Sequence, residues 1–142
     1  MKVLSPFGPK IAIIKIPKNM IKKINLEVDK ILNDKKRLKK SDYSNKLVGQ
    51  VKQEIKLSSK FIQTNLIKFI GDNVKSYIKK CIKKDVRKIV LKNLWVVRQF
   101  KNEYNPIHFH SGNISGVGYL KIPKNITKSR KRLKTNGTID FI

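Results

Sequence analysis

Two histidines, His108 and His110, carry the most distinctive chemistry of this sequence, and they are the only histidines in the chain. They stand in the stretch Asn105-Pro-Ile-His-Phe-His-Ser-Gly. On an extended backbone, residues i and i+2 point to the same face, so two imidazoles at this spacing can reach one metal ion. Imidazole suits zinc, iron, copper and nickel. The spacing alone leaves two interpretations open: a metal site, which needs a third ligand from elsewhere, or two surface histidines in a loop.

The second notable feature is charge, because 34 Lys and Arg residues face 9 Asp and Glu residues, for a formal net charge of +25. Such a balance is typical of a protein that binds nucleic acid or an anionic membrane surface. Most of the positive charge is lysine, however, and it is spread along the whole chain. A protein that reads bases would use more arginine for bidentate hydrogen bonds. We therefore favour biased composition, and expect only weak, non-specific binding of nucleic acid.

Cys81 is the only cysteine, which excludes a disulfide framework within the chain and a cysteine-rich zinc site. Near the N-terminus, Pro6, Gly8 and Pro9 interrupt the apolar core that a secretory signal requires. No stretch approaches the roughly 18 apolar residues of a membrane span. We therefore expect a soluble protein of a reducing cytoplasm, with no membrane partner.

Residues 1–85 are expected to form a helical support region. The β-branched segment 10–16 predicts a strand, and an amphipathic helix capped by Asn19 follows it. The helix is expected to fade in the charged run 34–42, interpreted as a surface loop. Segment 46–57 is ambiguous, and irregular or short-strand structure is favoured there. The apolar stripe of the helix predicted after Asn19 consists of Ile21, Ile24, Val28, Ile31 and Leu32.

A second, longer helix is predicted after Ser58 and Ser59, which are suitable caps. Cys81 lies on the apolar stripe of this helix, so we expect a buried structural thiol there. The other stripe residues are Phe61, Ile62, Leu66, Phe69, Ile70, Val74, Tyr77, Ile78 and Ile82.

The composition changes after Asp85, and the remainder is expected to be rich in strands. Strands are predicted over 89–100, 114–122 and 137–142. The last of these has no successor in the sequence and would leave an open edge, which favours association with another chain. The sequence is therefore expected to be incomplete at its C-terminus, and an oligomer is expected to be accessible.

The residues around the histidines resemble a known family. Trp95-Val-Val-Arg-Gln-Phe, then the His-x-His pair, then Ser115-Gly-Val-Gly-Tyr-Leu are similar to motifs of 2-oxoglutarate/Fe(II)-dependent oxygenases of marine phages and bacteria. Gly137-Thr-Ile-Asp-Phe also resembles the next strand of that family. The match covers about residues 90–142. The combination of His-x-His with Ser-Gly-Val-x-Tyr-Leu is fairly specific.

The resemblance implies an α+β fold, in which N-terminal helices pack on a double-stranded β-helix of the jelly-roll, cupin-like type. Residues 1–142 would form a single oxygenase-like domain, incomplete at the C-terminus, with 86–142 as the first part of the β-helix. The cytoplasm of a bacterium or of a phage-infected host would be its location.

The resemblance also implies Fe(II) as the metal and 2-oxoglutarate as the co-substrate. His108 matches the first metal ligand, and His110 takes the place that a carboxylate holds in the wider superfamily. Tyr119 matches a position that often contacts 2-oxoglutarate, although an ordinary barrel-core aromatic fits it as well. Asn105 and Ser111 are near enough in sequence to orient the imidazoles, and surface turns suit them equally.

The sequence departs from the family because some of the family's site residues are absent from it. A distal histidine, and the Arg or Lys that pairs with the co-substrate, would lie beyond Ile142, and Asp140 is expected to point outward. The implied reaction is oxidative hydroxylation of a small-molecule or protein substrate, and the chain carries half of the site. Three alternatives stay open: an inactive fragment of such an oxygenase, a basic nucleic-acid-binding protein, and a non-enzymatic cupin-like metal-binding domain.

Overall fold

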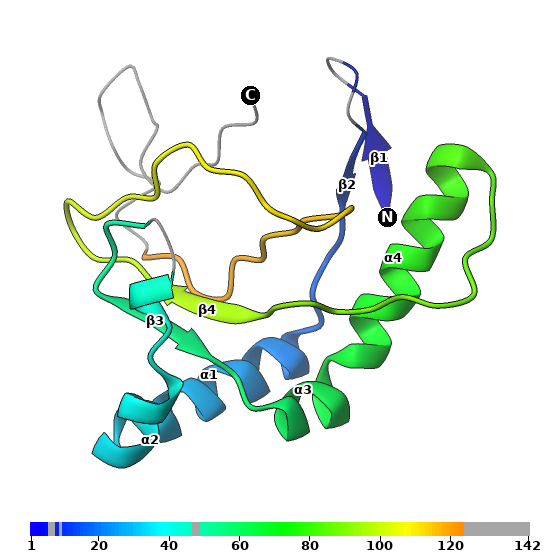
Figure 1. Cartoon of the computed structure of the whole chain (residues 1–142). Coiled ribbons are helices and arrows are strands. Elements are labelled where there is room, and N and C mark those ends of the chain that lie inside the picture. Colours follow the sequence, from blue (N-terminus) through cyan, green and yellow to red (C-terminus); the bar gives the residue numbers. More distant parts are fainter. Residues whose placement is uncertain (6–7, 9, 47–48, 124–142) are drawn as a thin grey trace.

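The computed structural model of the chain describes residues 1–5, 8, 10–46 and 49–123 (Figure 1). That part of the chain has an α+β fold with four α-helices and two small antiparallel sheets, as the α+β prediction required. The helices are α1 (Lys18–Leu32), α2 (Lys35–Ser41), α3 (Ser59–Asn65) and α4 (Ile67–Ile82), with a 3-10 turn η1 (Ser44–Lys46). The strands are β1 (Lys2–Leu4), β2 (Ile11–Ile13), β3 (Gln53–Lys56) and β4 (Trp95–Arg98).

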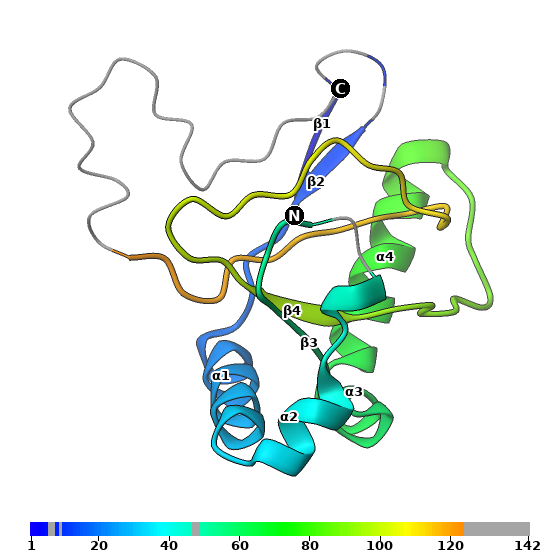
Figure 2. The ribbon, with the colours of Figure 1, turned by 60° about the vertical axis from the view of Figure 1, so that its left-hand side comes forward.

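Each sheet has two strands. In the first, β1 pairs with β2, so the strand predicted over 10–16 forms in part and gains a partner that the sequence did not predict. In the second, β3 pairs with β4, which joins the expected helical region to the expected β region in one sheet. The first sheet stands beside α4, and the second lies against α1, α2 and α3 (Figures 1 and 2).

The β-rich part is less regular than predicted. The strand expected over 89–100 is confined to Trp95–Arg98, and 114–122 is extended chain that forms no strand. The prediction of a strand over 114–122 is therefore wrong in this structure, since no neighbouring strand pairs with its backbone. The described residues contain no closed barrel. The strand predicted over 137–142 lies outside the described residues.

The core lies between α1 and the β3–β4 sheet. Ile24, Val28 and Ile31 of α1 are buried, as the stripe predicted, and they pack with Ile55 of β3 and with Leu66. Burying each of these side chains contributes about 1.5–3 kcal/mol. This cluster fixes the sheet to the helices and so gives the outer face of β3–β4 a stable base.

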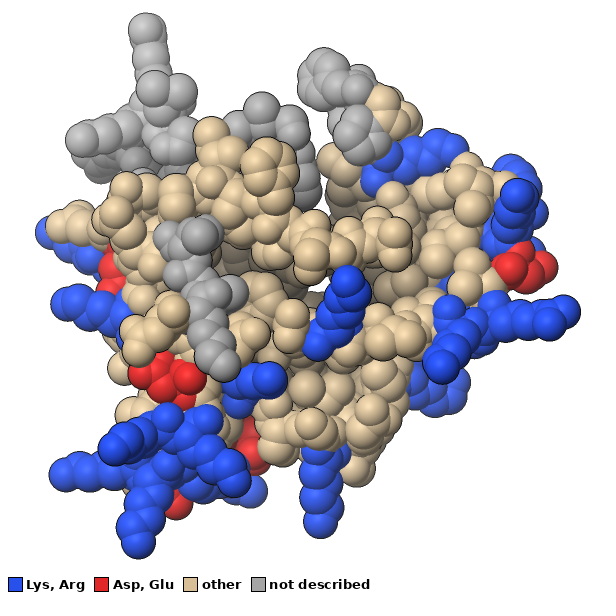
Figure 3. Space-filling view, in the orientation of Figure 1, with Lys and Arg blue, Asp and Glu red and all other residues tan. Residues whose placement is uncertain are grey.

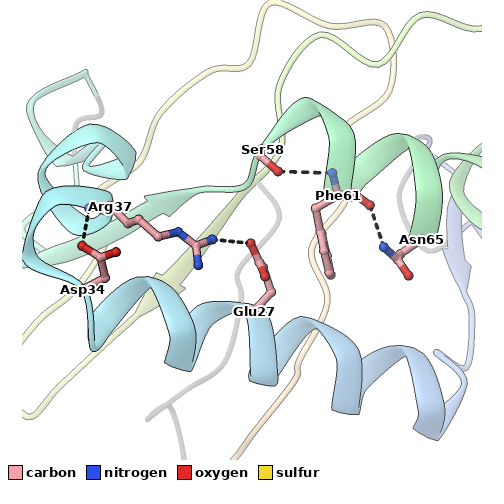
Figure 4. A network of polar contacts seen from close by, with 6 residues as sticks. All are labelled: Glu27, Asp34, Arg37, Ser58, Phe61 and Asn65. Atoms are coloured by element: carbon pink, nitrogen blue, oxygen red, sulfur yellow. Dashed lines mark hydrogen bonds and ion pairs between the residues drawn. The ribbon is translucent and has the colours of Figure 1, made fainter.

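The charged run 34–42 is not a loop, because residues 35–41 form α2 (Figure 4). Oδ1 of Asp34 accepts hydrogen bonds from the backbone N–H groups of Lys36 and Arg37, at 2.9 and 3.1 Å. The Arg37 guanidinium pairs with Glu27 of α1 at 2.7 Å, and Leu38 packs against the core. A cap, an ion pair and one apolar contact therefore order a segment whose charge density suggested a loop.

The second predicted helix is two helices, α3 and α4, separated at Leu66. Ser58 caps α3 as predicted, since its Oγ accepts from the backbone N–H of Phe61 at 3.2 Å (Figure 4). Asn65 donates from its side-chain amide to the carbonyl of Phe61 at 3.1 Å. Leu66 leaves helical geometry with φ −123° and is buried in the core, so packing of this side chain accompanies the break.

Two smaller predictions on the helices also need correction. The N-cap of α1 is Pro17, and Asn19 does not cap it; Oδ1 of Asn19 instead lies 2.8 Å from the N–H of Met20. Cys81 is half-buried where burial was expected. Near it, Lys10 donates to the Cys81 carbonyl and Tyr77 donates to the Lys10 carbonyl, which ties β2 to the end of α4.

None of the helices in the described part of the chain has the length and apolar character needed to cross a membrane. The reducing cytoplasm stays a prediction from the single cysteine.

Candidate metal centre

The β3–β4 sheet presents one face to the core and the opposite face to the loop that carries His108 and His110, here called the histidine loop. In its register, Glu54 pairs with Val97 and Lys56 pairs with Trp95. Paired residues of an antiparallel ladder point to the same side, and successive residues alternate between sides. These four side chains therefore share the outer face, because Ile55 belongs to the core.

After β4 the chain makes a local turn at residues 100–103 and then continues alongside the segment that precedes β3. The Glu103 carboxylate accepts from the backbone N–H of Phe100 at 2.8 Å and from that of Lys52 at 3.3 Å. Asn102 adopts a positive φ of 67°, which asparagine tolerates better than most residues. The N–H of Gln50 then donates to the Tyr104 carbonyl at 2.9 Å. These contacts place the residues that follow Tyr104 next to the sheet.

The structure brings His108 and His110 together. Their Nε2 atoms are 3.1 Å apart, and their ring centroids are 4.7 Å apart with an interplanar angle of 83°. This separation of the Nε2 atoms is that of a hydrogen bond between the two rings.

The backbone determines which nitrogen of His108 is open. Nδ1 of His108 lies 2.7 Å from the Pro106 carbonyl oxygen, which can only accept, so Nδ1 carries the proton and donates. In the neutral ring Nε2 then presents its lone pair, and in this metal-free arrangement Nε2–H of His110 donates to it. A hydrogen bond of this kind on the second ring nitrogen is the usual companion of a metal-bound imidazole.

Two aromatic residues, Trp95 and Tyr43, form an aromatic wall next to His110. The Trp95 ring centroid lies 6.1 Å from that of His110, and Tyr43 lies 6.1 Å from Trp95 on its other side. Nζ of Lys56 sits over the Tyr43 ring at 5.2 Å from the centroid, within the range of a cation–π contact. The sequence singled out Trp95 only as part of a motif, and it gave no signal for Tyr43.

Glu54 is the functional candidate that sequence reasoning missed. Its side chain is only 2% exposed, and Oε2 has no hydrogen-bond partner among the described residues. Burial raises the pKa of the Glu54 carboxyl, His108 nearby lowers it in part, and Asp42 raises it. Only Val51, Ile55 and Leu57 are apolar in the segment 51–57, so no local pattern indicated that Glu54 would be buried.

The contacts of Asn105 and Ser111 lie outside the histidine pair. Asn105 lies against Gly49, where an added Cβ atom would force the Asn105 side chain to shift. Ser111 accepts at its carbonyl from Nζ of Lys92 at 3.2 Å. Tyr119 lies half-exposed in the extended segment 114–122, and its contact with 2-oxoglutarate stays a prediction. Asp140 lies outside the described residues.

The pair is open to solvent. His108 and His110 are both exposed, Ile107 is 80% exposed and Phe109 is 98% exposed. Among the described residues, no three His, Cys, Asp or Glu side chains gather closely enough to hold a metal ion. An ion can therefore reach the two imidazoles, which fill only part of its coordination sphere.

No protein-family model, curated protein or solved structure matches the chain. The resemblance to the oxygenases therefore rests on the motif residues themselves.

Proposed function

We propose that this chain binds a divalent transition metal through Nε2 of His108 and of His110, as the metal centre of a 2-oxoglutarate/Fe(II)-dependent oxygenase. One observation supports the metal site above the others: two Nε2 atoms lie 3.1 Å apart while Nδ1 of His108 is engaged by a backbone carbonyl. Both rings therefore present the same nitrogen, Nε2, to one point, as two imidazole ligands of a single ion must. The oxygenase class follows from the resemblance around Trp95 and Tyr119.

The residues of the chain have definite roles in this proposal. His108 and His110 occupy two neighbouring positions and leave the others open, as a metal that binds a co-substrate and oxygen requires. Pro106 fixes the ring of His108, and Trp95 limits how far His110 can turn. Iron with 2-oxoglutarate would supply the oxidising power for hydroxylation of a C–H bond. The protein's own contribution is orientation of the two imidazole ligands.

We also propose that the β-rich part of the chain belongs to a double-stranded β-helix, in which the apolar side chains of the segment 114–122 are covered. Val117, Tyr119 and Ile122 are exposed in that segment, and apolar side chains of this size are usually covered in a folded domain. Such a cover predicts that the backbone amides of 114–122 exchange slowly with solvent. Exchange as fast as that of an open loop would contradict the β-helix and would leave the metal site untouched.

The experiment that tests the function is anaerobic Fe(II) binding, with and without 2-oxoglutarate, to this chain and to His108→Ala. A weak visible charge-transfer band that needs both iron and 2-oxoglutarate, and that His108→Ala abolishes, supports the oxygenase. Iron binding without that band supports the non-enzymatic cupin-like domain. If the variant binds iron as the parent chain does, the histidine pair is not the site.

Helix α2 supports a second candidate function, the binding of polyanions such as nucleic acid. Five of its seven residues are basic and all five are exposed, and basic side chains gather over it at the lower left of Figure 3. Arg37 is held by Glu27, whereas the four lysines have no ion pair among the described residues. Phosphate contacts of this kind give affinity without sequence preference. The basic residues of α2 are Lys35, Lys36, Arg37, Lys39 and Lys40.

A further inference from the structure

Glu54 is a buried carboxylate whose Oε2 atom has no partner among the described residues, and its surroundings indicate which group could pair with it. It lies in the middle of β3 on the face shared with Lys56 and Trp95, and Trp95 contacts His110. The backbone carbonyl of Glu54 accepts from the N–H of Tyr43 at 2.8 Å, which holds this residue under the aromatic wall. The carboxylate therefore points to the side of the sheet from which the histidine loop approaches.

Lys56 shares that face of the sheet but does not pair with Oε2 of Glu54. Nζ of Lys56 lies over the Tyr43 ring instead, and Oε2 of Glu54 has no partner among the described residues. An unpaired buried carboxylate is destabilising, so such groups are normally paired with a cation or a hydrogen-bond donor. His108 is close enough to Glu54 to influence it electrostatically, so a cation at the histidine pair would act on this carboxylate more strongly.

We infer that Glu54 is the carboxylate partner of the cation held by His108 and His110, and that it meets the ion through a metal-bound water molecule. This inference rests on the proposed metal site. The contact runs through water because Glu54 and the two histidines do not form a ligand set of three. An ion with two imidazole ligands keeps water in its other positions, and such a water donates to Oε2. The carboxylate balances the charge of the ion and orients its water, as carboxylates beside metal sites commonly do.

Binding of Co(II) alone to the full chain, measured by calorimetry, tests this role. Glu54→Gln keeps the shape of the side chain and removes its charge, so we expect affinity to fall about 10- to 100-fold. Glu54→Asp should recover part of the loss. Asp72→Asn is the matched control, because it removes one exposed carboxylate of α4 from the same basic chain and should leave affinity unchanged.

Thermal unfolding without metal separates this role from a structural one. Glu54→Gln should unfold no lower than the parent chain, and Co(II) should raise its Tm less than that of the parent. If Glu54→Gln binds Co(II) as the parent does while His108→Ala does not, the inference is overturned and the metal site stands. If His108→Ala also binds Co(II) normally, the metal site fails and the inference with it.

Discussion

The Pro106 carbonyl oxygen and Nδ1 of His108 are 2.7 Å apart, and this contact joins the backbone of the loop to the ring of a proposed metal ligand. Proline restricts its own φ to about −65°, so the carbonyl that receives the Nδ1 proton belongs to a stiff part of the loop. The ring is thus presented with Nε2 toward His110 before any ion arrives. Such preorganisation lowers the conformational entropy that metal binding must overcome.

The single tryptophan of the chain makes metal binding at the pair directly measurable. Trp95 lies 6.1 Å from His110 between ring centroids, so a paramagnetic ion such as Co(II) at the pair should quench Trp95 fluorescence. We expect His108→Ala or His110→Ala to abolish the saturable quenching, because one imidazole alone is a weak ligand.

Phe109→Ala is the control for these variants. Phe109 lies between the two histidines in the sequence and is 98% exposed, so removal of its side chain should leave both the fold and the quenching curve unchanged. Quenching that persists in both histidine variants would place the ion elsewhere.

Glu54 should make stability depend on pH in a definite direction. Burial raises the pKa of the Glu54 carboxyl in the folded chain above its value in the unfolded chain, with a smaller opposing effect of His108. The folded state then binds this proton more tightly, so stability falls as pH rises through the folded pKa. Glu54→Gln should stabilise the metal-free chain at pH 7 by about 1–3 kcal/mol, the cost of a buried unpaired group.

The comparison of pH 7 with acidic pH checks the sign of this effect. The difference between Glu54→Gln and the parent chain should shrink as pH falls toward 4, because both side chains are then neutral. Denaturant unfolding at several pH values measures it. A difference that grows on acidification would show that the Glu54 carboxylate stabilises the metal-free fold.

Local patterns in the sequence predicted part of this fold and missed contacts between distant segments. The stripe of α1 and the Ser58 cap follow from spacing and residue type, and both are confirmed. The pairing of β3 with β4 joins segments about 40 residues apart, which no local pattern encodes. Helix α2 was missed because the dense charge of the run 34–42 was interpreted as a surface loop.

The candidate site was likewise predicted only in part from the sequence. Spacing predicted that His108 and His110 could meet, and the structure places their Nε2 atoms in contact. The parts that depend on tertiary structure, namely the buried Glu54 and the ring contact of Trp95, could not be predicted because the register of β3 against β4 creates them.

The N-cap of α2 can be tested by a single pair of substitutions. Asp34→Ala removes the acceptor for the N–H groups of Lys36 and Arg37, so we expect a loss of about 0.5–2 kcal/mol in the free energy of unfolding. Asp34→Asn keeps a capping oxygen and should lose much less. Equal losses in the two variants would mean that the charge of Asp34 matters and the hydrogen bonds do not.

The basic face of α2 should bind single- or double-stranded DNA in a strongly salt-dependent manner. Replacing Lys35, Lys36, Lys39 and Lys40 with glutamine should weaken binding uniformly across sequences, because phosphate contacts carry no sequence information. The slope of log K against log salt should become less steep by about 1 for each phosphate that the variant no longer neutralises. Fluorescence anisotropy of labelled DNA at several salt concentrations measures both quantities.

The control replaces four exposed lysines elsewhere, Lys60, Lys75, Lys80 and Lys84, and so removes the same charge from the chain. If both quadruple variants show the same fall in affinity and in slope, binding follows the net charge of the chain and α2 is not a dedicated surface.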